Sequence, residues 1–150
     1  MKKSDRLQVI VDLNANNEKK ALEALGKAQR EQQASRVQLE NLQSYHQEYK
    51  KKYQSISEAG INIAQLLEFR SFVSKLDKAI GEQEQVVIQG EKDVFYAREY
   101  WEKQHQKTKS LEKVCLSALA EEFKQEEKRE QNEQDDRASR FGGVGGTRNA

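Results

Sequence analysis

Two runs of a seven-residue hydrophobic repeat, separated by a few residues around Gly60, restrict the folds open to this chain more than any other feature. Such a repeat places apolar residues at its first and fourth positions, called a and d, and buries one narrow seam between two helices. Two runs joined by a short connection must lie next to each other and antiparallel. The sequence therefore predicts an all-α fold, a long antiparallel two-helix coiled coil (helical hairpin) with its turn near Gly60.

The first run starts where Ser4 or Asp5 can cap a helix, and it continues without a helix breaker as far as Ser57. It predicts a helix over about residues 5–57. Polar residues interrupt the seam, but the frame holds without a skip. Its a positions are Val11, Glu18, Leu25, Gln32, Leu39, His46 and Tyr53, and its d positions are Leu7, Asn14, Ala21, Ala28, Ser35, Leu42, Tyr49 and Ile56.

The second run has fewer polar interruptions and predicts a helix over about residues 64–139. Its a positions are Leu66, Val73, Ile80, Val87, Val94, Trp101, Thr108 and Cys115, and its d positions are Phe69, Leu76, Gln83, Gly90, Ala97, Gln104, Leu111 and Ala118. Beyond position 118 the charged sequence carries no seam, so this part of the helix is predicted to have no partner. Residues 1–140 form a single hairpin domain in this interpretation, and the glycine-rich residues 141–150 form a flexible tail.

The turn position also sets which residues of the two helices face each other. Folding about Gly60 pairs residues whose numbers add up to about 122. Leu42 then faces Ile80, and the small Ala21 faces the large Trp101, as a filled core requires.

The composition excludes several classes of function. The chain has no proline, 34% charged residues and only 35% hydrophobic residues, too few for a layered core but enough for a narrow seam. A net charge of +1 does not suggest a nucleic-acid partner. No apolar run approaches the ~20 residues of a membrane span, the start is no signal peptide, and a single cysteine forms no internal disulfide. We expect a cytoplasmic protein without direct membrane insertion.

No catalytic, cofactor-binding or metal-ligating constellation is visible in the sequence. His46 falls on the seam and His105 at an e position, and neither stands one helical turn from a second ligand. Cys115 is predicted to be a small buried hydrophobe rather than a reactive thiol. Gly142-Gly143 and Gly145-Gly146 lack the context of a phosphate-binding loop. The chain is therefore predicted not to be an enzyme and to hold no cofactor or metal.

The two edges of the seam differ in character. The edge formed by the e positions is wholly polar, whereas the g positions carry Tyr45, Phe72, Ala79 and Val86. In an antiparallel pair the g positions of both helices meet on one side, so these four are expected to cluster there, next to seam residues of the same segment. Two interpretations stay open: a seam that is wider than a and d alone, or a stripe that binds a partner.

These features together resemble the FliJ family, the small coiled-coil component of the bacterial flagellar protein-export apparatus, over nearly the whole chain. The resemblance rests on length, turn position and the order of the motifs. The motifs are Arg6-Leu7-x-x-Ile10, Leu39-x-x-Leu42-x-x-Tyr45-x-x-x-Tyr49, Gly60, Phe72-x-x-x-Leu76-x-x-Ala79-Ile80, Gln83, Trp101 and the charged run EEKREQNEQDDRAS.

The resemblance implies a non-catalytic stalk and adaptor, similar to the central stalk of rotary ATPases. Such a protein inserts into the hexameric export ATPase and activates it, links it to the cytoplasmic linker region of the transmembrane export gate, and handles export chaperones. It acts in flagellum biogenesis, and thereby in chemotaxis, as a peripheral protein at the cytoplasmic face of the inner membrane. The family's gate-binding surface corresponds here to Gln38, Leu42, Tyr45, Tyr49, Phe72, Leu76 and Ala79, with Gln83 at its edge, where the family can carry histidine.

Two alternatives to the flagellar stalk remain at this point. One is the equivalent stalk of a virulence type III secretion system, which the genetic neighbourhood would distinguish. The other is a structural coiled-coil spacer that merely dimerises, which sedimentation would distinguish.

Overall fold

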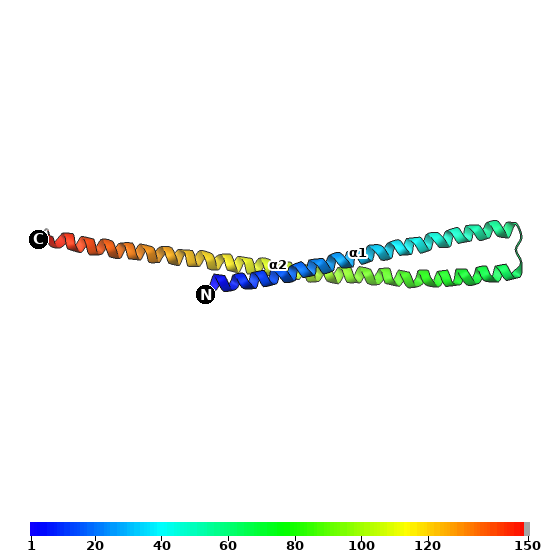
Figure 1. Ribbon diagram of the computed structural model, residues 1–150, viewed down its shortest axis with the longest axis horizontal. Coiled ribbons are helices and arrows are strands. Elements are labelled where there is room, and N and C mark those ends of the chain that lie inside the picture. Colours follow the sequence, from blue (N-terminus) through cyan, green and yellow to red (C-terminus); the bar gives the residue numbers. More distant parts are fainter. Residues whose placement is uncertain (149–150) are drawn as a thin grey trace. The chain divides into compact units, whose positions relative to one another are not determined.

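The structure, a computed structural model, describes residues 1–148, with side chains through residue 142. The described part of the chain contains two helices and no strand. Helix α1 spans Lys3–Glu58 and helix α2 spans Ile63–Arg148, and the two run antiparallel on either side of the turn (Figure 1). The predicted all-α helical hairpin is confirmed.

The turn lies where the sequence places it, because Gly60 ends α1. The N–H of Ala59 donates to the carbonyl oxygen of Ile56 (3.1 Å), and the N–H of Gly60 donates to that of Ser57 (3.1 Å). Gly60 has a φ of 92°. A residue with a Cβ atom would be strained by about 1–2 kcal/mol at such a positive φ, whereas glycine is not.

Helix α2 begins with a reciprocal pair of side-chain caps, a feature that the heptad pattern does not show. The Asn62 Oδ1 accepts from the N–H of Gln65 (2.8 Å), and the Gln65 Oε1 accepts from the N–H of Asn62 (3.4 Å). This is a capping box, which satisfies two backbone donors at a helix start.

Replacing Asn62 with alanine is expected to lower the free energy of unfolding by about 1 kcal/mol, because the N–H of Gln65 then loses its acceptor. Urea unfolding followed by circular dichroism measures this loss. The matched control is Asn41→Ala, which removes an exposed amide from the middle of α1. Equal stability of the two variants would contradict a capping role for Asn62.

Both helices extend beyond the predicted bounds. Helix α1 begins two residues earlier than predicted and ends one residue later, whereas α2 continues from the predicted end near 139 to Arg148. The chain has no proline, and a helical glycine costs only about 1 kcal/mol relative to alanine, so no residue of this stretch forbids the helix. The flexibility predicted for residues 141–150 stays a prediction, and positions 149–150 lie outside the described residues.

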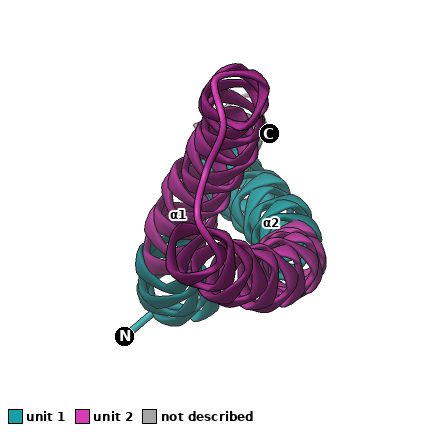
Figure 2. Cartoon of the chain, turned by 90° about the vertical axis from the view of Figure 1, so that its right-hand side faces the viewer, with its two compact units in different colours: residues 1–17, 104–150 teal, residues 18–103 magenta. Residues whose placement is uncertain are grey.

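The chain divides into two compact units (Figure 2), residues 18–103 and residues 1–17 with 104–150. In unit 2, residues 18–103, α1 and α2 pack along the predicted seam, where Ala21, Leu25, Leu76 and Val94 are at most 7% exposed. The facing pairs follow the predicted register. The rings of Tyr53 and Phe69 stack 3.5 Å apart, and a Cβ on Gly90 would lie 3.6 Å from the Cα of Gln32.

Unit 1, residues 1–17 and 104–150, packs the start of α1 against α2 in the same register. Its buried apolar residues are Val11, Cys115 and Ala118, and its seam also contains a buried polar layer. The Asn14 Nδ2 donates to the Thr108 Oγ1 (2.7 Å) and to the carbonyl oxygen of Gln104 (3.2 Å). A satisfied polar layer of this kind specifies register, because a shifted alignment would leave the amide unpaired.

Contact within unit 1 reaches further along α2 than the sequence predicted. The Ser4 N–H (3.1 Å) and the Ser4 Oγ (2.6 Å) both donate to the carboxylate of Glu122. The expected end of partnered sequence near position 118 is therefore corrected by about one turn. The reason is local: the free N–H groups at the start of α1 attract a carboxylate from the facing helix.

This contact makes a pH dependence predictable. The Ser4 hydroxyl, then the Ser4 N–H, hold the pKa of Glu122 below its ordinary value of 4.5. A lowered folded-state pKa means that the contact stabilises the fold above about pH 4.5 and is lost as the pH falls through the folded-state value. Glu122→Gln should therefore lower the thermal midpoint near neutral pH and have no effect in acid. A difference in midpoint that is the same at every pH would contradict this assignment.

Candidate functional site

The eight residues that the family resemblance assigns to a partner-binding surface all lie in the unit of residues 18–103. Helix α1 contributes Gln38, Leu42, Tyr45 and Tyr49, and helix α2 contributes Phe72, Leu76, Ala79 and Gln83.

The rings at the centre of this set are in contact across the two helices. The ring centroids of Tyr45 and Phe72 lie 6.0 Å apart in an edge-to-face arrangement, and those of Tyr49 and Phe72 lie 4.3 Å apart. Tyr45 and Tyr49, one turn apart on α1, have centroids 6.4 Å apart. The g positions of the two helices thus meet on one side, as the antiparallel frame predicts. We call Tyr45, Tyr49, Phe72 and Ala79 the aromatic edge.

The eight residues are not equally available to a partner. Tyr45 is 48% exposed and Gln38 is also exposed, whereas Leu76 is 7% exposed and belongs to the core. The remaining five are half-buried. The g positions therefore widen the seam and leave part of their surface open at the same time, so both interpretations of the aromatic edge have a structural basis.

Gln83 has a partner within the hairpin. Its Nε2 donates to the carbonyl oxygen of Ser35 (2.9 Å), which ties α2 to α1 at one end of the candidate surface. This hydrogen bond holds the two helices together at this position of the seam. This gives Gln83 a structural reason to be there, beside any contact that it makes with a partner.

The ring cluster extends further towards the turn than the heptad pattern predicts. Tyr53 and Phe69 were assigned only as seam positions, yet Phe69 also stacks on Tyr49 with centroids 5.2 Å apart. Five rings thus form one continuous cluster near the turn. The signal that could have revealed it is the spacing of Tyr45, Tyr49 and Tyr53 at every fourth residue, which places the three rings along one side of α1.

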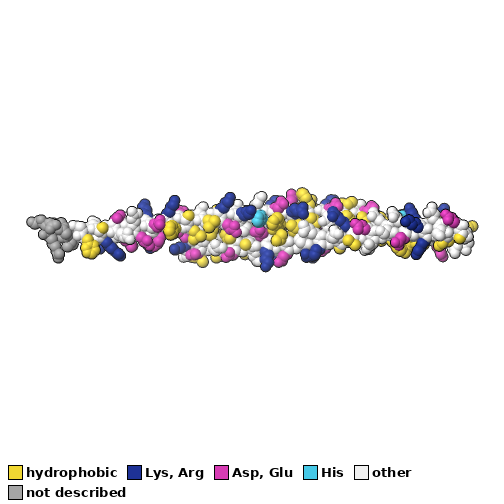
Figure 3. All heavy atoms as spheres, turned by 90° about the horizontal axis from the view of Figure 1, so that it is seen from above, with side chains coloured by type: hydrophobic (Ala, Val, Ile, Leu, Met, Phe, Trp, Pro, Cys, Tyr) yellow, Lys and Arg dark blue, Asp and Glu magenta, His cyan; other side chains and the backbone are white. Residues whose placement is uncertain are grey.

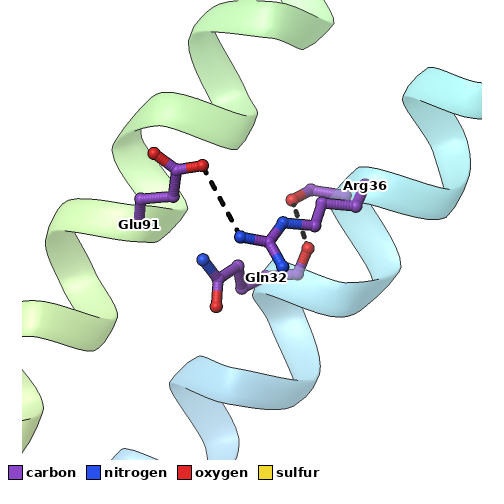
Figure 4. Close-up of polar contacts among 4 residues, drawn as sticks. Gln32, Arg36 and Glu91 are labelled. Atoms are coloured by element: carbon purple, nitrogen blue, oxygen red, sulfur yellow. Dashed lines mark hydrogen bonds and ion pairs between the residues drawn. The ribbon is translucent and has the colours of Figure 1, made fainter.

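The opposite edge is polar, as predicted. The Arg36 Nη2 of α1 lies 3.6 Å from the Glu91 Oε1 of α2, across the gap between the helices (Figure 4). Both side chains are about half exposed, so the pair orients the helices but contributes less than about 1 kcal/mol. The His46 Nε2 lies 2.7 Å from the Asp77 Oδ1, which explains a histidine in the seam without a metal.

On the face shown in Figure 3, charged side chains of both signs alternate with hydrophobic ones along the helices. The described residues contain no cluster of His, Cys, Asp or Glu that could hold a metal ion. Over the same residues, neither helix has a stretch apolar enough to cross a bilayer.

Two antiparallel helices with a half-open aromatic edge define a helical-hairpin protein whose candidate site is a contact surface. The family model described as FliJ, flagellar FliJ protein, matches residues 2–143. The chain therefore belongs to the FliJ family, a non-catalytic component related to flagellar protein export, and the resemblance seen in the sequence is confirmed. No curated protein and no solved structure matched the chain.

Proposed function

We propose that this protein is the stalk and adaptor of the flagellar export apparatus, joining the hexameric export ATPase to the linker region of the transmembrane export gate. It acts by contact and has no chemistry of its own. Family membership supports the flagellar assignment. The observation that carries the adaptor role is the aromatic edge, where Tyr45 leaves about half of its surface open beside Phe72.

The aromatic edge has the properties of a protein contact surface. Tyrosine and phenylalanine are enriched among residues that dominate interface energies, and they are most effective when a packed surrounding keeps their rings in place. Here Tyr45 is held by Tyr49 on its own helix and by Phe72 on the facing helix. A partner that covers the open ring loses little side-chain entropy on this protein, because the ring is already ordered.

The proposed role also includes the terminal portions of the hairpin and the location of the protein in the cell. The ends of the hairpin, residues 1–17 and 104–150, would enter the ATPase ring and promote its assembly and activity. Export chaperones would bind as further partners. The protein would be cytoplasmic and peripheral at the inner face of the membrane, where the export gate lies, and would serve flagellum biogenesis.

An ATPase assay tests the proposal directly. The full chain is mixed with the cognate export ATPase, and the hydrolysis rate and the formation of rings are measured with and without it. Stimulation of both is the expected result. A second assay measures binding to the purified cytoplasmic region of the gate. Failure of both assays would overturn the stalk and adaptor function.

A further inference from the structure

A partly enclosed hollow lies between the helices next to the turn, outside the eight residues assigned above except for Tyr49. Its volume is about 190 Å³. It is lined by Tyr49, Lys52, Tyr53, Ile56, Ile61, Gln65 and Phe69. An apolar cavity of about 150 Å³ holds benzene, so this hollow has room for one large aliphatic or aromatic side chain. We call it the tip pocket.

The tip pocket continues the aromatic edge by one heptad. Lys52 follows Tyr45 by seven residues on α1, and Gln65 precedes Phe72 by seven residues on α2. Both therefore occupy g positions and lie on the same side of the seam as the aromatic edge. Seven residues of helix span about 10 Å, so one partner segment can reach both places.

The charge next to the tip pocket indicates which charged group of a partner should lie beside the apolar side chain that enters the pocket. Lys52 is the only charged residue in its lining. Between positions 50 and 70 the chain carries four basic and two acidic residues, with Lys50 and Lys51 directly before Lys52. A carboxylate beside the inserted side chain would meet a lysine ammonium, whereas a cation there would be repelled.

One lining residue is more exposed than its heptad position predicts. Ile56 is a d position, but it is 53% exposed, unlike the other predicted seam residues. Its side chain lines the hollow next to the turn at Gly60. An isoleucine half open at the mouth of an apolar hollow gains free energy when a partner's side chain covers it.

We propose that the tip pocket is a second anchor point for the partner of the aromatic edge, and that it takes a large apolar side chain flanked by a carboxylate. The inference rests on the proposed gate binding and adds to it a specific subsite and its chemistry. The partner segment presents two apolar side chains about 10 Å apart. One covers Tyr45 and Phe72, and the other enters the tip pocket with its acidic neighbour on Lys52.

Two pairs of matched variants of the full chain test the tip pocket, with the purified cytoplasmic linker segment of the export gate as the probe. Lys52→Glu reverses the charge in the lining, and Lys51→Glu makes the same change on the adjacent exposed position. Ile56→Trp fills the hollow, and Ile63→Trp places the same ring at a 77% exposed position outside it. Dissociation constants are measured by titration calorimetry at low and high salt.

Lys52→Glu and Ile56→Trp are expected to weaken binding about tenfold, and the two controls less than about twofold. The effect of Lys52→Glu should shrink at high salt. Methyl NMR of isoleucine adds a readout in the unmodified protein: the signals of Ile56 and Ile61 should shift on addition of the segment. Those of Ile10 and Ile88, which lie elsewhere, should not.

The possible results distinguish a failure of the tip pocket from a failure of gate binding as a whole. Binding that is equal in test and control variants, with unshifted Ile56 and Ile61 signals, overturns the tip pocket and leaves gate binding in place. Failure of the unmodified chain to bind the segment overturns both. Shifts of Ile56 and Ile61 that depend on protein concentration alone would show that a second copy fills the hollow, which also overturns the proposal.

Discussion

Replacing Tyr45 and Phe72 together by alanine is expected to weaken binding of the export gate's cytoplasmic region roughly a hundredfold. Tyr45, at 48%, is the one exposed large hydrophobic residue among the eight candidates, and Phe72 supports it at a centroid distance of 6.0 Å. The two losses should not add independently, because the residues touch. Titration calorimetry with the purified gate region measures the change, and far-ultraviolet circular dichroism checks that helicity is retained.

The chain offers a closely matched control for this pair. Phe95 and Tyr96 are one phenylalanine and one tyrosine in edge-to-face contact on α2, with centroids 5.6 Å apart. They are 57% and 63% exposed, and they lie outside the aromatic edge. Replacing both by alanine removes the same kinds of side chain and should leave gate binding within about twofold.

Two results would contradict the expected role of the aromatic edge. Equal loss of binding in both double variants would mean that exposed aromatic area in general, rather than this edge, mediates the contact. Loss of helicity in the Tyr45 and Phe72 variant would mean that these rings serve mainly to widen the seam. Tyr45→Ala alone, at the more exposed of the two positions, then decides whether any binding role remains.

The seam could be predicted because it depends on sequence period alone. Every predicted a and d position is buried or half-buried except Ile56, which lies beside the turn. The antiparallel frame also predicted that the aromatic g positions of both helices lie on one side of the seam and the polar e positions on the other. The contacts of Tyr45 with Phe72 and of Arg36 with Glu91 agree with this. These features need no knowledge of side-chain conformation.

Contacts that depend on particular side-chain conformations could not be predicted. The hydrogen bond from Gln83 to Ser35 and the contact of Ser4 with Glu122 each require one rotamer among many. The tip pocket lies next to the turn, where its shape depends on the local path of the backbone. The end of α2 was misplaced because glycine weakens a helix without forbidding it, whereas proline would have ended it.

Leu76→Ala is expected to lower the free energy of unfolding of the hairpin by about 2–3 kcal/mol. Leu76 belongs to the proposed gate-binding set, yet it is 7% exposed and packs within the seam. Removing its side chain leaves a cavity between the helices, and two helices can close only part of it. Urea unfolding monitored by circular dichroism measures the loss. The matched control is Leu67→Ala on the same helix, at a 59% exposed position, where the change should stay within about 0.5 kcal/mol.

Leu76→Ala and Tyr45→Ala together show whether a residue supports the binding surface from beneath or contacts the partner itself. If Leu76 acts from beneath the surface, its variant loses stability first, and any loss of gate binding follows from disorder of the rings above it. Stabilising conditions, such as lower temperature or an added osmolyte, should then restore binding to the Leu76 variant but not to the Tyr45 variant. Normal stability of Leu76→Ala together with lost gate binding would mean that the partner opens the seam and contacts Leu76 directly.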